Sequence, residues 1–572
     1  MRKQTKIAAI VSAAALLAVG ASMTSFAATG WQEENGTWVY YDKDGEYVTN
    51  SWQKSGDNYF YLDDDGLMAV DSLIEDDENY YYVDSNGAMV TNQWIAIDNE
   101  NYGDDNEPEV HWYYFQANGK AYKRSATATS IQLKTINGKK YTFNENGQML
   151  YGWVTSAGEI DYDSDAYTNC DYYFGGENDG AMTVGWVEID LTDVADADTE
   201  QPGDAYWEAD QTRWFYFKSS GKKVTNTTNQ SINGRRYGFD EDGRMIAGWY
   251  ATWDTSSDTA TRIPGISNAT ASDFLYFSTP EDGARYTKGW FKVVPGYYLG
   301  ASYTKDETTG AVTFKTTSSD YEDGSSNWYY AQGDGKIYAS VIKSINGKKY
   351  AFASDGSMLS GFQLLTVDSN GNIGSNPTNS GKSTEADFLK TVETLQEAIV
   401  KGTTTFYYFS GDADTDGSMK TGKYTITIDD SDYTFYFKTS GADKGKAYHG
   451  YNSSDKKIYA GGMLLKATSD NKVEVVVQKK DMYFKMSVAD FIKDAQKLGY
   501  GEIEGVPSSA DSSVKTYAYD VKQKDGTLTK ADITAVYVIN TSGTVLTSEK
   551  KDAEGYKVTG AKDGTAISIT HE

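Results

Sequence analysis

Short runs of alternating apolar and polar residues, each closed by a glycine turn, recur along most of the chain. The turn glycines follow Asp, Asn or Ser at Gly45, Gly66, Gly87, Gly119, Gly147, Gly180, Gly221, Gly243, Gly283, Gly335, Gly356, Gly417 and Gly441. Asx-Gly between apolar runs predicts a two-residue β-hairpin turn, because both central positions need positive φ. The spacing is regular at the first three turns and widens later, where long segments are inserted.

A larger period lies on top of the hairpin period. Trp112, Trp214 and Trp328 open equivalent strands, and each is followed by an Ile-Asn-Gly hairpin that begins at Ile136, Ile232 or Ile345. The duplicated unit is therefore about three hairpins long. Since a lone hairpin is marginal in water, such units must stack on their neighbours to bury a core. We therefore expect an all-β fold, a β-hairpin solenoid over residues 28–464.

Counting back from each turn glycine separates the two faces of the second strand, because side chains alternate with period two. Positions −6 and −4 are apolar almost throughout, as in Phe60/Leu62 and Phe215/Phe217, so this face is predicted to be the core. Positions −7 and −5 are doubly aromatic in some hairpins and carry Lys140/Thr142, Arg236/Gly238 or Lys349/Ala351 in others. A face that tolerates lysine is not required for the core, so its aromatic pairs are candidates for ligand contact.

The two ends of the chain differ from the repeats. Residues 1–27 have a basic start, an apolar stretch and Ser25-Phe26-Ala27, which is typical of a secretory signal peptide; a retained membrane anchor is the alternative. Residues 465–572 are expected to form a small α+β cap with degenerate hairpins, including a helix opened by Ser487 and strands at 516–521 and 533–539. One inserted helix is expected at 384–400, where apolar residues recur at helical spacing.

The amino-acid composition argues against several classes of function. The chain has 82 acidic against 53 basic residues, a net charge of −29 and one cysteine, Cys170. We therefore expect no nucleic-acid partner and no disulfide framework. No enzyme, cofactor or metal site is expected, since His111, His449 and His571 are scattered and no catalytic motif is present. Asp412–Asp416 resembles half of a calcium loop, but Lys423 occupies its twelfth position, which favours an acidic hairpin turn.

The segments from Gly30 to Gly45 and from Tyr141 to Trp153 resemble the cell-wall-binding, or choline-binding, repeat of secreted Gram-positive proteins. The resemblance extends over roughly residues 30–465 and is more distant to glucan-binding repeats of glucosyltransferases. It implies aromatic cages from consecutive hairpins around the quaternary ammonium of choline on teichoic acid. Such a cation donates no hydrogen bonds and is bound by cation–π and apolar contacts.

Carried over by position, the resemblance gives a set of ligand-binding candidates. They are Trp31, Trp38, Tyr40, Trp52, Tyr59, Tyr61, Tyr80, Tyr82, Trp94, Trp112, Tyr114, Trp186, Trp214 and Tyr216. Lys140, Arg236 and Lys349 stand where the family often has Trp, and a fixed cation there would repel choline. Choline binding is therefore expected in the N-terminal hairpins.

These features predict a secreted protein that is attached noncovalently to the cell wall or cell surface. It is expected to bind choline-bearing teichoic acid or another surface glycan, with no membrane segment after removal of the signal. The alternative is a glucan-binding or adhesive scaffold whose acidic inserts recognise another partner. Packing of the aromatic rings between hairpins would favour the scaffold, and exposed rings would favour the binder.

Overall fold

The protein is described by a computed structural model. It describes residues 29–103, 107–191, 212–251, 271, 274–296, 299, 302–305, 312–315, 323–374, 396–397, 399–402, 404–410, 414, 416–428, 430–498, 501–503, 515–520 and 533–571. The predicted signal peptide at 1–27 and the predicted helix from 384 to 395 lie outside these residues.

The chain divides into two compact units, which are described separately. The first comprises Met1–Gly248 with Phe277–Arg285, and the second Trp249–Tyr276 with Tyr286–Glu572. The division passes through β18 (Gly248–Ala251) and β19 (Phe274–Phe277). The predicted boundary between 464 and 465 lies inside the second unit and stays a prediction.

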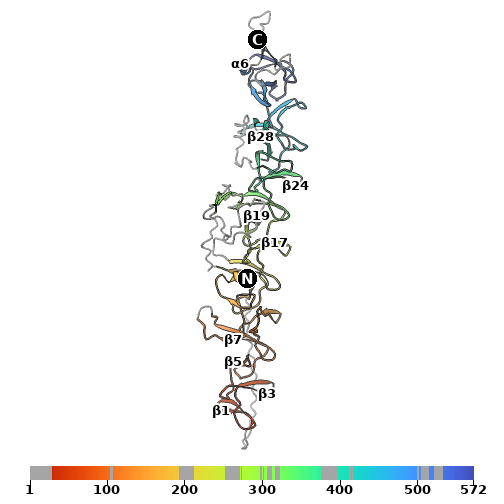
Figure 1. Cartoon of the computed structure of the whole chain (residues 1–572). Helices are drawn as coiled ribbons and strands as arrows, with labels where there is room; N and C mark the ends of the chain where they lie inside the picture. Colours follow the sequence, from red (N-terminus) through yellow and green to blue (C-terminus); the bar gives the residue numbers. More distant parts are fainter. Residues whose placement is uncertain are drawn as a thin grey trace. The chain divides into compact units, whose positions relative to one another are not determined.

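The first unit is a succession of short antiparallel hairpins (Figure 1). They are β1 (Gly30–Glu34) with β2 (Thr37–Tyr41), β3 (Ser51–Ser55) with β4 (Asn58–Leu62), β5 (Ser72–Asp76) with β6 (Asn79–Val83), β7 (Gln93–Asp98) with β8 (Val110–Phe115), β9 (Lys134–Ile136) with β10 (Lys139–Tyr141), β11 (Trp153–Val154) between β12 (Ile160–Asp161) and β13 (Tyr172–Tyr173), β14 (Gly185–Asp190) with β15 (Thr212–Phe217), and β16 (Thr227–Ile232) with β17 (Arg235–Phe239). A single helical turn, α1 (Ala166–Asn169), precedes β13.

The second unit begins with two-stranded hairpins and then forms a larger sheet. They are β20 (Gly289–Val293) with β23 (Asn327–Ala331), β21 (Ser302–Lys305) with β22 (Val312–Lys315), β24 (Val341–Ile345) with β25 (Lys348–Phe352), and β26 (Gly361–Leu365) with β27 (Thr405–Phe409). A five-stranded sheet follows, in the order β28 (Gly422–Ile428), β29 (Ser431–Phe437), β32 (Met463–Leu464), β31 (Lys457–Ala460) and β30 (Gly450–Asn452). The predicted all-β array of hairpins is confirmed.

A backbone hydrogen bond of one kind recurs between successive hairpins. The amide two residues after a turn glycine donates to the carbonyl at position −7 of the preceding hairpin, as Met68 does to Trp38, Met89 to Tyr59 and Met149 to Trp112, each at 2.8 Å. In the second unit Met358 donates to Trp328 at 2.8 Å in the same way. This bond uses backbone groups that an isolated hairpin leaves unpaired, so stacking satisfies them.

The turn glycines serve the stacking as well as the turn. At Gly180 φ is +56°, and an added Cβ would lie 2.2 Å from Sδ of Met149, which belongs to the preceding hairpin. A residue with a side chain would therefore meet backbone strain and would force that flexible methionine to move.

The predicted core face is confirmed. Positions −6 and −4 are almost fully buried in most hairpins: Phe60 and Leu62 are 4% and 0% exposed, and Phe215 and Phe217 are both 0% exposed. Because each hairpin buries only this face, the core is a row of small aromatic clusters and not one large interior.

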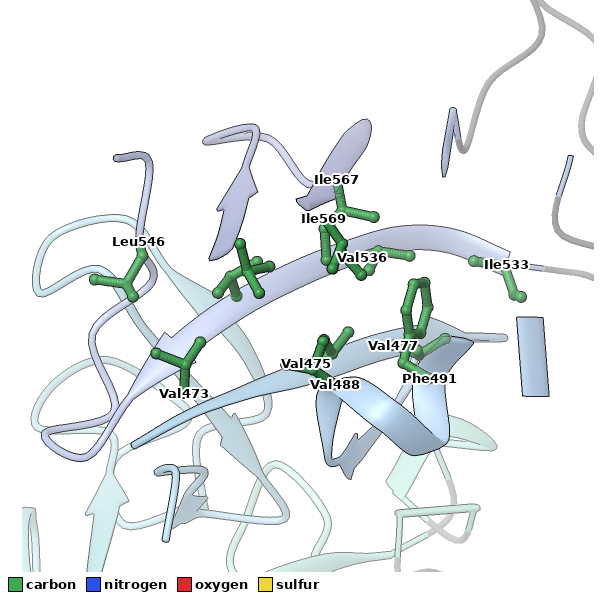
Figure 2. Close-up of a cluster of buried hydrophobic side chains, with 12 residues drawn as sticks. Val473, Val475, Val477, Val488, Phe491, Ile533, Val536, Leu546, Ile567 and Ile569 are labelled. Carbon is green, nitrogen blue, oxygen red and sulfur yellow. The ribbon is translucent and has the colours of Figure 1, made fainter. Parts of the chain in front are cut away.

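The C-terminal region is the predicted α+β structure. The sheet β34 (Met482–Met486), β33 (Val473–Lys479) and β37 (Ile533–Asn540) carries helix α6 (Val488–Leu498). A second sheet has the order β35 (Gly501–Ile503), β36 (Lys515–Asp520), β40 (Ala566–His571), β39 (Tyr556–Gly560) and β38 (Lys550–Lys551). Figure 2 shows Val475, Val477, Val488 and Phe491 converging with Val536, Ile567 and Ile569 in one core.

Two predicted helices can be compared with the residues that the structure describes. Gln396–Glu397 and Ile399–Val400 are helical, and buried Gln396 exchanges hydrogen bonds with the backbone of Tyr483, so this end of the predicted insert helix docks on the protein. Ser487 Oγ accepts a hydrogen bond from the Asp490 amide at 3.0 Å at the start of α6, as predicted for a helix cap. Within the described ranges, no helix is long and apolar enough to cross a membrane.

Candidate functional site

In five hairpins a tryptophan of the first strand lies directly opposite the tyrosine at −5 of the second. The pairs are Trp31 with Tyr40, Trp52 with Tyr61, Trp94 with Tyr114, Trp186 with Tyr216, and Trp290 with Tyr330. The ring centroids are 5.1–5.4 Å apart and the ring planes are steeply inclined in all five. Edge-to-face contacts of this kind are favourable, so each pair stabilises its own hairpin.

The same tryptophans also contact the core ring at −6 of the next hairpin. Trp31 lies 5.4 Å from Phe60, Trp52 5.1 Å from Tyr81, Trp94 4.9 Å from Tyr141, Trp186 4.9 Å from Tyr237, and Trp290 4.8 Å from Tyr350. Tyr61 at −5 is only 8% exposed. The prediction that the −7/−5 face is dispensable for the core is therefore wrong at −5, because the −5 ring supports the tryptophan that joins two hairpins.

The rings at −7 lie at the rim of the hairpins and are more accessible. Tyr59 is 42% exposed, and Trp38, Tyr80, Trp112 and Trp214 are half-buried. The Trp112 indole donates to Asn178 Oδ1 at 3.1 Å, which orients its ring toward a later turn. The −5 tyrosines Tyr40, Tyr82, Tyr114 and Tyr216 are half-buried too, so ligand contact at either position stays a prediction.

The residue that faces the −7 ring across the hairpin differs in charge from one hairpin to another. Glu33 faces Trp38, Glu75 faces Tyr80, and Glu188 faces Trp214, whereas Lys54 faces Tyr59 and Ala96 faces Trp112. Cross-strand partners share one face of a hairpin, so the carboxylates lie beside the rings. Hairpins with Glu opposite −7 offer a cation both an aromatic face and a negative charge.

Several of the predicted ligand-binding residues lie close together in the structure, and others are in contact with packing partners. Trp186 lies 6.2 Å from Trp214 and near Tyr216, although residues 191–211 separate the strands in sequence. Trp94, Trp112 and Tyr114 likewise pack against one core cluster. Trp52 donates its indole N–H to Asp76 at 3.1 Å, and Tyr82 lies 6.1 Å from Phe115, so both have packing partners.

Trp31 carries an unusual polar atom. Its Nε1 is buried, and no described residue accepts a hydrogen bond from it. An unpaired indole N–H costs free energy, which the ring contacts of Trp31 with Tyr40 and Phe60 must offset.

The three Ile-Asn-Gly hairpins place basic residues in the contacts between hairpins. Lys140 and Arg236 at −7 are exposed, and the residue before each of the three −7 cations forms an ion pair with the aspartate that precedes a later turn glycine. The pairs are Lys139 with Asp179 at 3.4 Å, Arg235 with Asp282 at 2.6 Å, and Lys348 with Asp416 at 3.1 Å. The carbonyls of Lys140, Arg236 and Lys349 accept the stacking amides at 2.8 Å.

This basic dipeptide therefore belongs to the stacking of the hairpins. Sequence analysis missed the ion pair, although the signal was present: a Lys-Lys or Arg-Arg dipeptide after Asn-Gly recurs with an Asp-Gly turn in the following hairpin. At the arginine pair, hydrogen bonds from Arg235 lower the pKa of the Asp282 carboxyl below its usual value.

We expect Arg235→Gln to destabilise the first unit by about 1 kcal/mol or less at pH 7, because the pair is exposed. The lowered pKa means that the contribution is present above the unfolded pKa of Asp282 and is lost as pH falls through the folded value. Urea denaturation at pH 7 and near pH 3 measures this. A difference between wild type and variant that persists at the acid pH would contradict the assignment.

Catalytic and metal-ligating residues do not gather among the described residues. No group of three or more His, Cys, Asp or Glu side chains there could hold a metal ion. Asp414 and Asp416 of the acidic turn are ion-paired with Lys292 and Lys348, at 2.6 Å and 3.1 Å. Cys170 is buried, and its burial raises the pKa of the thiol to about 12, which opposes thiolate chemistry.

Parts of the chain are similar to known proteins. Residues 48–94 match the family model described as choline-binding repeat, and residues 111–121 match the one described as putative cell wall binding repeat. Glucosyltransferase-S of Streptococcus mutans serotype c (strain ATCC 700610 / UA159) is 25% identical over 292 residues, which cover 46% of this chain and 16% of that protein. The chain thus spans a small part of the length of that relative.

Solved structures of Streptococcus pneumoniae proteins are also similar. The autolysin LytC, solved with a synthetic peptidoglycan ligand, is 17% identical and covers 59% of this chain and 55% of its own, with a TM-score of 0.29. The choline-binding domain of CbpL is 20% identical and covers 45% and 97%, with a TM-score of 0.26. Choline binding protein F is 16% identical and covers 76% and 98%, with a TM-score of 0.20.

The matched segments coincide with hairpins described above. Residues 48–94 span β3 to β6 and the start of β7, and residues 111–121 span β8 and its turn. Two segments of the first unit therefore match choline-binding and cell-wall-binding repeats, and a longer part of the chain has a more distant similarity to a glucosyltransferase.

Proposed function

We propose that the protein is a secreted, noncovalently attached cell-surface protein that binds choline on teichoic acid through the aromatic rims of its hairpins. The observation that carries this proposal is the aromatic rim of the first hairpin. This hairpin directly precedes residues 48–94, which match the choline-binding repeat. There Trp38 is half-buried at the rim, Glu33 faces it across the hairpin, and exposed Tyr59 follows in the next hairpin.

The chemistry of this rim suits a quaternary ammonium ion. Trimethylammonium has no N–H to donate, so it gains most from aromatic faces and a nearby negative charge. Each favourable ring contributes about 0.5–2 kcal/mol. The Glu33 carboxylate adds a Coulombic attraction that a neutral sugar does not receive. The rim therefore selects a cation over a neutral ligand.

Choline binding can be measured on the full chain by its intrinsic tryptophan fluorescence. We expect choline chloride to change the fluorescence at millimolar concentration, and sodium chloride at the same ionic strength to leave it unchanged. The salt control is essential because a protein with a net charge of −29 binds any anion exchanger, including a choline-like DEAE resin, by charge alone. Equal responses to both salts would contradict specific recognition.

Glucan binding is the second candidate, and the similarity to Glucosyltransferase-S favours it. Tyrosine and tryptophan faces can stack on sugar rings, and the exposed Lys140 and Arg236 could donate to hydroxyl groups. Pull-down with purified wall that contains choline, wall stripped of teichoic acid, and insoluble glucan separates the two. Retention by glucan alone would promote this candidate over choline recognition.

We also propose that binding is the activity of this chain and that it carries no catalytic centre of its own. LytC is an autolysin and Glucosyltransferase-S a transferase, so repeats of this kind occur in enzymes as well. The proposal is supported by the separation of the described histidines and the burial of Cys170. Release of soluble fragments from purified wall or of sugar from sucrose would contradict it.

A further inference from the structure

Several lysines of the chain place their ammonium groups over tyrosine rings. Lys54 Nζ lies 5.5 Å from the centroid of Tyr59, Lys123 5.5 Å from Tyr80, Lys134 5.6 Å from Tyr122, and Lys343 5.8 Å from Tyr338. These distances are within the range of a cation–π contact. These four tyrosine faces are therefore already in contact with cations of the chain.

Two of these contacts occupy equivalent positions in the duplicated units. Lys134 and Lys343 each stand thirteen residues before their turn glycines, Gly147 and Gly356, and each covers the tyrosine three residues after the previous turn. Those tyrosines stack on the −5 tyrosine of their hairpins, with ring centroids 5.8 Å and 5.7 Å apart. The same lysine, tyrosine and stacked ring thus recur as a set.

The third duplicated unit provides a natural comparison. At the equivalent positions it has Gln230 in place of the lysine and Val224 in place of the tyrosine. The cation and the ring are lost together. This joint replacement indicates that lysine and tyrosine act as a pair, because a lysine needed only for solubility would not depend on the ring.

The first two hairpins also differ in whether a lysine is present beside the ring at −7. The residue that faces the −7 ring is Glu33 in the first hairpin and Lys54 in the second. Tyr59 is 42% exposed, so its ring would be available if the ammonium group of Lys54 were not over it.

We propose that Lys54 is a specificity-determining residue that acts as a tethered cation on Tyr59, so that external choline binds this rim only by displacing it. The proposal rests on the choline-binding function proposed above. A cation fixed by the chain competes at a high effective concentration, whereas Glu33 in the first hairpin attracts an external cation. The charge opposite −7 therefore distinguishes the second hairpin from the first as a place for choline.

Substitution of Lys54 in the full chain tests the proposal. Lys54→Gln should raise the choline affinity measured by calorimetry about two- to fivefold, the equivalent of one exposed cation–π contact, and Lys54→Glu should raise it further. Lys444→Gln is the matched control, because Lys444 is exposed and lies in the other unit but gives the same change of charge. Binding of a neutral glucan oligosaccharide and the thermal midpoint should not change in any variant.

The reciprocal change strengthens the test. Glu33→Lys should lower choline affinity in a chain that keeps Lys54, because it gives the first hairpin the charge of the second. If wild type binds choline through Trp38 and the choline affinities of Lys54→Gln and Lys444→Gln are equal, Lys54 is not a tethered cation. The proposed function then stands. If neither wild type nor Lys54→Gln binds choline, the proposed function is wrong and this inference falls with it. Binding by Lys54→Gln alone supports the inference most strongly.

Discussion

Trp186→Ala should destabilise the first unit by about 3 kcal/mol, the lower end of the cost of removing a large aromatic side chain from a core, because Trp186 is half-buried. Trp186 lies 5.1 Å from Tyr216 in its own hairpin, and 4.9 Å from Tyr237 and 5.6 Å from Phe239 in the next. One substitution therefore opens a cavity between two hairpins. The loss should be large because neither hairpin is stable without its neighbour.

Calorimetric unfolding of the full chain measures this effect. The chain has two units, so the transition of the first should shift while that of the second stays in place. Trp186→Phe is the control, since it keeps an aromatic ring and should recover part of the loss. A variant with an unchanged first transition would show that the tryptophan is not a packing residue.

The hairpins and their core face could be predicted from the sequence because both depend on local signals. Asx-Gly fixes the turn, and the period of two fixes which side chains share a face. The buried Phe215 and Phe217 follow directly from their count before Gly221. These predictions needed no knowledge of which hairpin lies beside which.

Contacts between hairpins could not be predicted in the same way. The ion pair of Arg235 with Asp282 joins residues 47 positions apart, and the contact of Met149 with Gly180 depends on the stacking geometry. The prediction for Lys140, that its charge would repel choline, likewise could not foresee that its neighbour Lys139 pairs with Asp179. The sequence shows the residue types, but the rotation between hairpins decides which side chains meet.

The distinction between −5 and −7 follows from the same geometry. The first-strand tryptophan lies opposite −5, as Trp31 lies opposite Tyr40, so the −5 ring is enclosed between two strands and the next hairpin. The −7 ring lies nearer the turn of the hairpin, opposite Glu33 in the first hairpin, and is half-buried there. The −5 and −7 rings of a single strand thus have different neighbours, the first-strand tryptophan for one and a residue near the hairpin turn for the other.

Trp38→Ala should reduce choline affinity by about 1–3 kcal/mol, or roughly five- to 150-fold, and leave stability nearly unchanged. Trp38 is at the accessible −7 position and faces Glu33, so its ring can contact an external cation. Only its backbone carbonyl takes part in the stacking bond, with the Met68 amide at 2.8 Å, and alanine keeps that carbonyl.

Two controls separate ligand contact from folding. Trp38→Tyr should keep most of the affinity, because a ring remains at the rim. Tyr102→Ala should change nothing, because Tyr102 is 65% exposed and lies in the loop after β7, away from the −7 positions. Calorimetric titration with choline and thermal unfolding should be measured on the same samples. Unchanged affinity together with a lowered thermal midpoint in Trp38→Ala would identify the ring as structural and would remove the main support for choline recognition by the first hairpin.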